Sequence, residues 1–264
     1  MSKQHSRILL AVLNIIGFIG VVTVNYLANA LPLGGKTTGQ ISDQYPNLFV
    51  PSGLTFSIWG VIYILLAIFV IYCLIISIKT PMQYKSFVQK IGVLFFVTCI
   101  ANVAWIFSWH YEVLPLSLIF MVVLLVTLAV IYERLDVGRK VARPTEKYLV
   151  HLPISIYFGW ISIATIANVT ALLVAYKWNR FGLGEGLWAA VMIGIGTVLA
   201  LLLLFSRRDL FYALVVNWAV IGILIKRIAD TSTPAKNVTI TSIACISVMT
   251  IAMAFQIIRG NVYR

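Results

Sequence analysis

The stretch QYPNLFVPSGLTFSIWGVIYILLAIFVIYCLIISI, at residues 44–78, contains no charged side chain. Its second half is an apolar run long enough to cross a hydrocarbon core of about 30 Å as a helix. Its first half contains Pro46 and Pro51, which stiffen a loop, and Pro51 marks the expected entrance to the helix. Because this loop carries apolar side chains that water does not favour, we expect it to fold back onto the membrane part of the protein.

Composition places the whole chain in a membrane. Of its 264 residues, 61% are hydrophobic and 11% are charged, whereas a soluble domain carries about 25% charged residues. Eight charge-free runs follow one another along the sequence. They lie at residues 8–35, 44–78, 91–111, 113–132, 148–176, 186–206, 210–225 and 237–258. The sequence therefore predicts an all-α integral membrane protein, a bundle of about eight transmembrane helices. The run at 210–225 is the shortest, and a helix lying on the membrane surface is the alternative there.

The distribution of charge predicts the topology. The net charge is +12. With eight spans, Lys and Arg concentrate in the loops and ends on the same side as the N-terminus, which is the positive-inside bias. We therefore expect both termini in the cytoplasm, the lipid bilayer as the partner of the basic surface, and no nucleic acid. The short loops suit a bacterial plasma membrane.

Three predicted helices each carry a stripe of aromatic, small or amide side chains on one face. The stripes are Phe56, Trp59 and Tyr63; Asn102, Trp105 and Trp109; and Trp160, Ala164 and Asn168. Aromatic surfaces with a few polar groups suit flat hydrophobic ligands. The same residue types also anchor helices at the membrane interface and form hydrogen bonds between helices, so packing is the alternative interpretation.

The sequence lacks the arrangements of residues that most enzymes and ion-coupled transporters use. All acidic residues fall in loops or at the ends of the predicted spans, which disfavours a proton-coupled pump. No Ser/His/Asp or Cys/His spacing, phosphate-binding glycine loop or metal-ligand cluster occurs. The sequence therefore predicts no catalytic residue, no metal site and no bound cofactor.

Three motifs resemble the translocator protein family, also called the tryptophan-rich sensory protein family. They are PSG at residues 51–53 ahead of the first stripe, NVAW at 102–105 and WISIATIAN at 160–168. They fall in family order on the second, third and fifth predicted helices. The resemblance implies a five-helix membrane domain at residues 1–176, followed by an additional three-helix extension at 177–264.

The resemblance also implies a function. In this family the stripes enclose a pocket, capped by the first loop, that binds porphyrins, sterols and synthetic aromatic compounds. The residues implied as its lining are Phe49, Pro51, Phe56, Trp59, Tyr63, Asn102, Trp105, Trp160, Ala164 and Asn168. We therefore expect a membrane receptor, sensor or carrier for a flat hydrophobic ligand, with porphyrin or haem as ligand and not as cofactor, and a homodimer is compatible with it.

Two alternatives to that function are a porphyrin-degrading membrane enzyme and an uncoupled small-solute transporter. The first loop lacks the tryptophans that the family carries there, which counts against the degrading enzyme. In a transporter, the three C-terminal helices would complete the pathway.

Overall fold

The computed structural model describes residues 3–31, 33–79 and 87–260, which are mostly helical and contain no strand. The eight longest helices in these residues are α1 (Lys3–Ala30), α3 (Ile58–Lys79), α5 (Leu94–His110), α6 (Leu114–Arg134), α8 (Leu152–Ala175), α9 (Glu185–Arg207), α10 (Leu210–Arg227) and α11 (Thr233–Ile258). The shorter helical segments are η1 (Leu33–Gly35), α2 (Thr38–Asp43), η2 (Gly53–Ser57), α4 (Phe87–Ile91), α7 (Pro144–Glu146), η3 (Lys147–His151) and η4 (Arg180–Gly182). This architecture confirms the predicted all-α class.

Of the helices in the described residues, seven are apolar and long enough to cross a membrane. The eighth long helix, α5, is also apolar but has only 17 residues. The chain is therefore an integral, multi-pass membrane protein. The predicted short span does form a regular helix: α10 has 18 residues and is about 27 Å long.

Helix α5 is the shortest of the eight long helices, and it begins later than the charge-free run that predicted it. The charge-free run begins at residue 91, but Ile91 ends α4 and α5 begins only at Leu94. Gly92 lies between them with a φ of 57°, a left-handed conformation that an L-residue with a side chain rarely adopts. This glycine turn separates the first residues of the run from the helix.

The described residues form two compact units, defined by contacts within each. Unit 1 contains Met1–Thr38, Trp59–Val137 and Ala142–Phe158. Unit 2 contains Gly39–Ile58, Gly138–Val141 and Gly159–Arg264. The predicted boundary at residue 176 stays a prediction.

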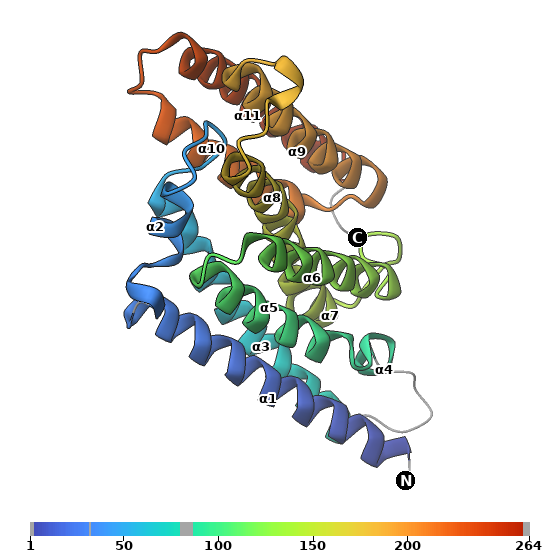
Figure 1. The fold of residues 1–264 in the computed structure, drawn as a ribbon. Coiled ribbons are helices and arrows are strands. Elements are labelled where there is room, and N and C mark those ends of the chain that lie inside the picture. Colours follow the sequence, from blue (N-terminus) through green and yellow to red (C-terminus); the bar gives the residue numbers. More distant parts are fainter. Residues whose placement is uncertain (1–2, 32, 80–86, 261–264) are drawn as a thin grey trace. The chain divides into compact units, whose positions relative to one another are not determined.

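In unit 1, α5 packs against both α1 and α6 (Figure 1). The connection from α5 to α6 is the short turn Tyr111–Val113, which makes these two helices antiparallel neighbours, as predicted. Helix α1 runs in the same direction as α5. Its middle residue Gly17 lies against Cys99, where a Cβ on the glycine would be 3.0 Å from the Cys99 Cβ. Close packing of this kind depends on a small residue at the contact.

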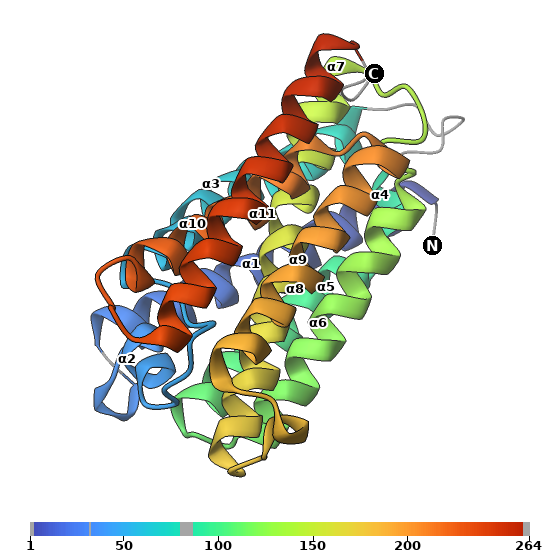
Figure 2. The same ribbon diagram turned by 90° about the horizontal axis from the view of Figure 1, so that it is seen from above.

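In unit 2, helices α9, α10 and α11 pack against one another, and Figure 2 shows α9 and α11 side by side along their length. A Cβ on Gly186 would lie 2.6 Å from the Pro234 carbonyl oxygen, so the two helices touch where both begin. Near their other ends, the Gln256 side chain donates a hydrogen bond to the Leu204 carbonyl at 3.2 Å. Helices α9 and α11 therefore run in the same direction, and α10 returns between them in the chain.

The loop ahead of α3 docks on α10 within unit 2. The Ser52 N–H donates to the Gly222 carbonyl at 3.0 Å, and the Trp218 indole N–H donates to the Thr55 carbonyl at 3.1 Å. The side chains of Leu48, Phe49 and Val50 are buried. The loop thus folds back onto a membrane helix, as its apolar side chains predicted, because burying them removes apolar surface from water.

Candidate functional site

Four of the ten predicted lining residues lie together in unit 1. The Trp59 ring stacks on Tyr63, with ring centroids 5.4 Å apart, and on Trp105, with centroids 5.9 Å apart. Tyr157, from the first part of α8, meets Trp59 edge-on at 6.2 Å. We call Trp59, Tyr63, Trp105 and Tyr157 the aromatic cluster. The stripes of α3 and α5 therefore face each other, which the sequence spacing could suggest but not establish.

A chain of amide hydrogen bonds lies beside the aromatic cluster. The Asn25 side-chain amide donates to the Asn102 side-chain oxygen at 2.8 Å, and Asn102 donates in turn to the Tyr157 hydroxyl at 3.1 Å. Asn102 is fully buried. This chain fixes the orientation of Asn102 and of the Tyr157 ring, so part of the cluster is held in place before any ligand arrives.

Tyr157 was not among the predicted site residues. It lies three residues before Trp160 on α8, a spacing that places it in line with the stripe of that helix. Extending the stripe by one turn toward the N-terminus would have identified it. Asn25 carried a weaker signal, since an amide inside a membrane helix requires a hydrogen-bond partner.

Trp105 carries a buried polar group that finds no partner in the residues the structure describes. Its side chain is 5% exposed, and its indole N–H is buried and meets no acceptor among the described residues. The Tyr63 hydroxyl is likewise buried without a hydrogen bond of acceptable geometry to the part of the chain that is described, although Asn102 lies near it. A buried donor left unpaired costs about 1–3 kcal/mol. An acceptor atom supplied by a ligand would recover that cost.

The other six predicted residues belong to unit 2: Phe49, Pro51, Phe56, Trp160, Ala164 and Asn168. Phe56 meets the Trp160 ring edge-on, with centroids 6.1 Å apart and planes at 85°. Trp160 and Asn168 are buried, and Ala164 is partly exposed. That all ten residues line one pocket stays a prediction.

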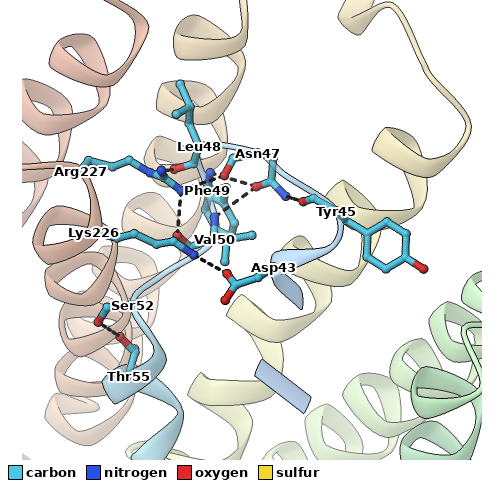
Figure 3. A network of polar contacts seen from close by, with 10 residues as sticks. All are labelled: Asp43, Tyr45, Asn47, Leu48, Phe49, Val50, Ser52, Thr55, Lys226 and Arg227. Atoms are coloured by element: carbon cyan, nitrogen blue, oxygen red, sulfur yellow. Dashed lines mark hydrogen bonds and ion pairs between the residues drawn. The ribbon is translucent and has the colours of Figure 1, made fainter. Parts of the chain in front are cut away.

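Two basic residues at the end of α10 hold the loop that contains Phe49 (Figure 3). Arg227 donates to three backbone carbonyls: Asn47 at 2.9 Å, Leu48 at 3.3 Å and Val50 at 3.3 Å. Lys226 pairs with Asp43 at 2.5 Å. The sequence suggested only that these two cations flank a short span at the membrane interface.

The loop also stabilises its own conformation. The Asn47 side-chain oxygen accepts from the N–H groups of Phe49 and Val50 at 3.0 and 3.1 Å, while its amide donates to the Tyr45 carbonyl at 2.8 Å (Figure 3). An Asn that bonds the backbone two and three residues on is a typical local turn. This turn presents the carbonyls of the loop to Arg227 and turns Phe49 into the unit.

No group of three or more His, Cys, Asp or Glu side chains that could hold a metal ion occurs in residues 3–31, 33–79 and 87–260. Cys73 and Cys99 are buried and unpaired by disulfides, and Cys245 is partly exposed and also free. The polar groups of the candidate site are therefore amides, indoles and phenols, which bind organic ligands by hydrogen bonding and stacking.

A family model described as "TSPO-like protein" matches residues 11–255. The match includes the three helices that follow residue 176, and it agrees with the family indicated by the three motifs. No curated protein and no solved structure matches the chain.

Proposed function

Because the chain belongs to the TSPO-like protein family, we propose that it is a membrane receptor, sensor or carrier that binds a flat hydrophobic ligand. A tetrapyrrole or a sterol-like molecule is the expected class. The proposed site in unit 1 is the aromatic cluster together with Asn102. The six predicted residues of unit 2 remain candidates for ligand contact.

The observation that carries the proposal is the indole N–H of Trp105, which meets no acceptor in the described part of the chain. It lies beside stacked aromatic rings that offer a flat apolar surface. A ligand with a planar body and a carbonyl, hydroxyl or carboxylate acceptor would stack on the rings and accept this hydrogen bond. Trp59 and Tyr63 are partly exposed, so a ligand can reach the edge of the cluster.

The packing alternative leads to a different expectation. If the rings and amides only hold α1, α3 and α5 together, removing the Trp105 N–H should leave ligand binding unchanged and should relieve an unpaired donor. The gain in stability of the ligand-free protein is expected under both interpretations, so ligand binding is the measurement that distinguishes them.

The experiment is a titration of the purified full-length protein in detergent with protoporphyrin, followed by the absorbance of the porphyrin. The variant is Trp105→Phe, which keeps an aromatic ring and removes the N–H. We expect saturable binding in the wild type and a Kd about tenfold higher or more in the variant. This increase corresponds to the free energy of one lost hydrogen bond to a charged acceptor. Tyr26→Phe, at an exposed aromatic residue of α1 outside the aromatic cluster, is the control and should bind like the wild type.

Each other outcome counts against a part of the proposal. Absence of saturable binding in the wild type would exclude the tetrapyrrole, and the same titration with a sterol then tests the second class. Equal affinity in Trp105→Phe and the wild type would remove the aromatic cluster as the site. Loss of the porphyrin spectrum under light, in the presence of the protein only, would favour the degrading enzyme.

A further inference from the structure

A cavity of about 340 Å³ lies in unit 2, where α8 ends and α9 begins. The loop residues Leu48 and Phe49 form one wall, and the last turns of α8 with the first turn of α9 form the others. Its volume is at the small end of the range for ligand pockets, about 300–1,000 Å³. The cavity is therefore large enough for a headgroup or a small molecule.

Two cations that line this cavity form no ion pair with an acidic side chain of the described residues. The Lys177 ammonium forms no ion pair or hydrogen bond with any described residue, and it is exposed. The Arg180 guanidinium donates from Nε to the Leu183 carbonyl at 3.2 Å, and its Nη groups have no partner in the part of the chain that is described. These two side chains can therefore bind an anion without first breaking an ion pair.

One carboxylate, Glu185, also lines the cavity. It interacts electrostatically with Arg227, which lies on the far side of the loop wall and binds its carbonyls. Two cations and one acid leave the lining positive. Glu185 also begins α9, whose N-cap Gly184 offers no side-chain cap, so the first N–H groups of the helix add to the positive potential.

The backbone that carries the two cations is strained. Lys177 and Arg180 have φ angles of 51° and 56°, and Phe181, which follows, has 55°. Left-handed conformations are uncommon for residues other than glycine and cost on the order of 1–2 kcal/mol each. Strain of this kind occurs preferentially at sites that bind ligands. Here it places both cations along one short turn next to the cavity.

Aromatic side chains beside the cavity are suited to the boundary between lipid and water. Trp178, in the cavity wall, meets Trp188 edge-on at 4.9 Å and Phe181 at 4.7 Å. Phe181 is 80% exposed, and Tyr176 is 69% exposed. Exposed aromatics next to cations are typical of a segment that lies among lipid headgroups.

We propose that this cavity binds the anionic headgroup of a bilayer amphiphile, a phosphate or carboxylate that pairs with Lys177 and Arg180. The apolar part of the molecule lies along Leu173 and Val174 of α8 and against Trp188. Arg227 acts as a positioning residue, because it holds the loop wall without touching the headgroup. The proposal uses unit 2 alone and is independent of the ligand proposed for the aromatic cluster.

The test is native mass spectrometry of the purified full-length protein in detergent, titrated with phosphatidylglycerol. Three further ligands separate the contributions of charge and tail. Phosphatidylcholine has tails and a neutral headgroup, and oleate has a tail and a carboxylate. Glycerol phosphate has a phosphate and no tail. We expect saturable binding of one phosphatidylglycerol, weaker binding of phosphatidylcholine, and no binding of glycerol phosphate at the same concentration. In Lys177→Gln/Arg180→Gln the Kd for phosphatidylglycerol should rise about tenfold or more, as expected for two basic residues near a headgroup.

The matched control is Lys236→Gln/Arg259→Gln, which removes the same charge from exposed positions outside the cavity. It should bind phosphatidylglycerol like the wild type, and Lys177→Arg should retain most of the affinity. Equal affinity in the cavity variant and the wild type would overturn the proposal, as would equal losses in the cavity and control variants. Binding of glycerol phosphate as tight as that of phosphatidylglycerol would identify a site for a free phosphate and overturn the assignment to a lipid. Lys177 and Lys236 are exposed, so their substitution should change the stability of the protein little. The Tm of each variant checks that it is folded.

Discussion

The Asn25 side-chain amide donates a hydrogen bond to the Asn102 side-chain oxygen at 2.8 Å, joining α1 to α5 inside unit 1. Both residues are buried. Because hydrocarbon offers no other donor or acceptor, the Asn102 oxygen would lose this hydrogen bond without replacement if Asn25 were removed. Asn102 also orients the Tyr157 hydroxyl, so this pair connects the packing of two helices to the geometry of the aromatic cluster.

The first prediction concerns that pair. We expect Asn25→Ala and Asn102→Ala to destabilise the protein and to show a coupling energy of about 0.6–1.7 kcal/mol in a double-mutant cycle, the range found for hydrogen bonds between membrane helices. Asn102→Ala should cost more than Asn25→Ala, because it also removes the bond to Tyr157. Unfolding of the single and double variants in mixed detergent measures these terms. Additive effects of the two substitutions would show that the bond contributes nothing to stability.

The second prediction concerns the contact between Gly222 and Thr55. A Cβ on Gly222 would lie 1.9 Å from the Thr55 Oγ1, so Gly222→Ala must push the loop away from α10. We expect a loss of about 1–3 kcal/mol in the free energy of unfolding, the usual cost of overpacking. Gly194 in α9 is the matched control, because nothing lies within 4 Å of a Cβ there. Gly194→Ala should be neutral or stabilise by up to about 1 kcal/mol.

A rescue experiment sharpens the second prediction. In Gly222→Ala/Thr55→Gly the clashing side chain is absent, so the Tm should recover relative to Gly222→Ala alone. A Tm that remains as low as in the single variant would mean that the alanine acts on α10 itself and not through the loop.

The third prediction contrasts the two cations at the end of α10. Arg227→Gln removes charged hydrogen bonds to three loop carbonyls, so the amides of residues 47–50 and of Ser52 should exchange with deuterium about tenfold faster or more. Lys226→Gln removes a pair whose Asp43 side chain is 61% exposed, and an exposed pair contributes little. Hydrogen exchange followed by mass spectrometry compares both with the wild type. Equal exchange in the two variants would contradict the role assigned to Arg227.

The fourth prediction concerns topology. With α5 crossing the membrane as an eighth span, both termini lie on one side, and the distribution of Lys and Arg predicts the cytoplasm. In a variant without native cysteines, Lys236→Cys, an exposed position in the first turn of α11, should react with an impermeant maleimide on intact cells. Val141→Cys, an exposed position between α6 and α8, should react only after the membrane is opened. The reverse pattern would place the termini outside.

The apolar runs predicted the long helices well, and for a simple reason. A backbone in hydrocarbon must satisfy its own hydrogen bonds, so a sufficiently long apolar run becomes a helix whatever its neighbours are. Residues 210–225 followed this rule despite their length. The run that begins at residue 91 did not follow it fully, because the positive φ of Gly92 ends one helix before the next begins.

The candidate site was predicted less completely. Spacing alone identified the stripe residues Trp59 and Trp105, whose rings meet in unit 1. It missed the part played by Tyr157, because a hydroxyl finds its partner through the approach of another helix. It also gave no sign that the Trp105 N–H would be left without an acceptor among the described residues.

Residue patterns alone identified a helical membrane protein, because hydropathy and helical periodicity act over a few neighbouring residues. Three motifs in the sequence indicated the TSPO-like family, and the family model agrees with them. Which helix receives the long loop became known from the three-dimensional contacts of the chain. The bonds from Arg227 reach residues about 180 positions earlier, and Gly222 admits Thr55 only because it has no side chain. Such contacts depend on how distant segments fit in space, and no local pattern in the chain specifies that fit.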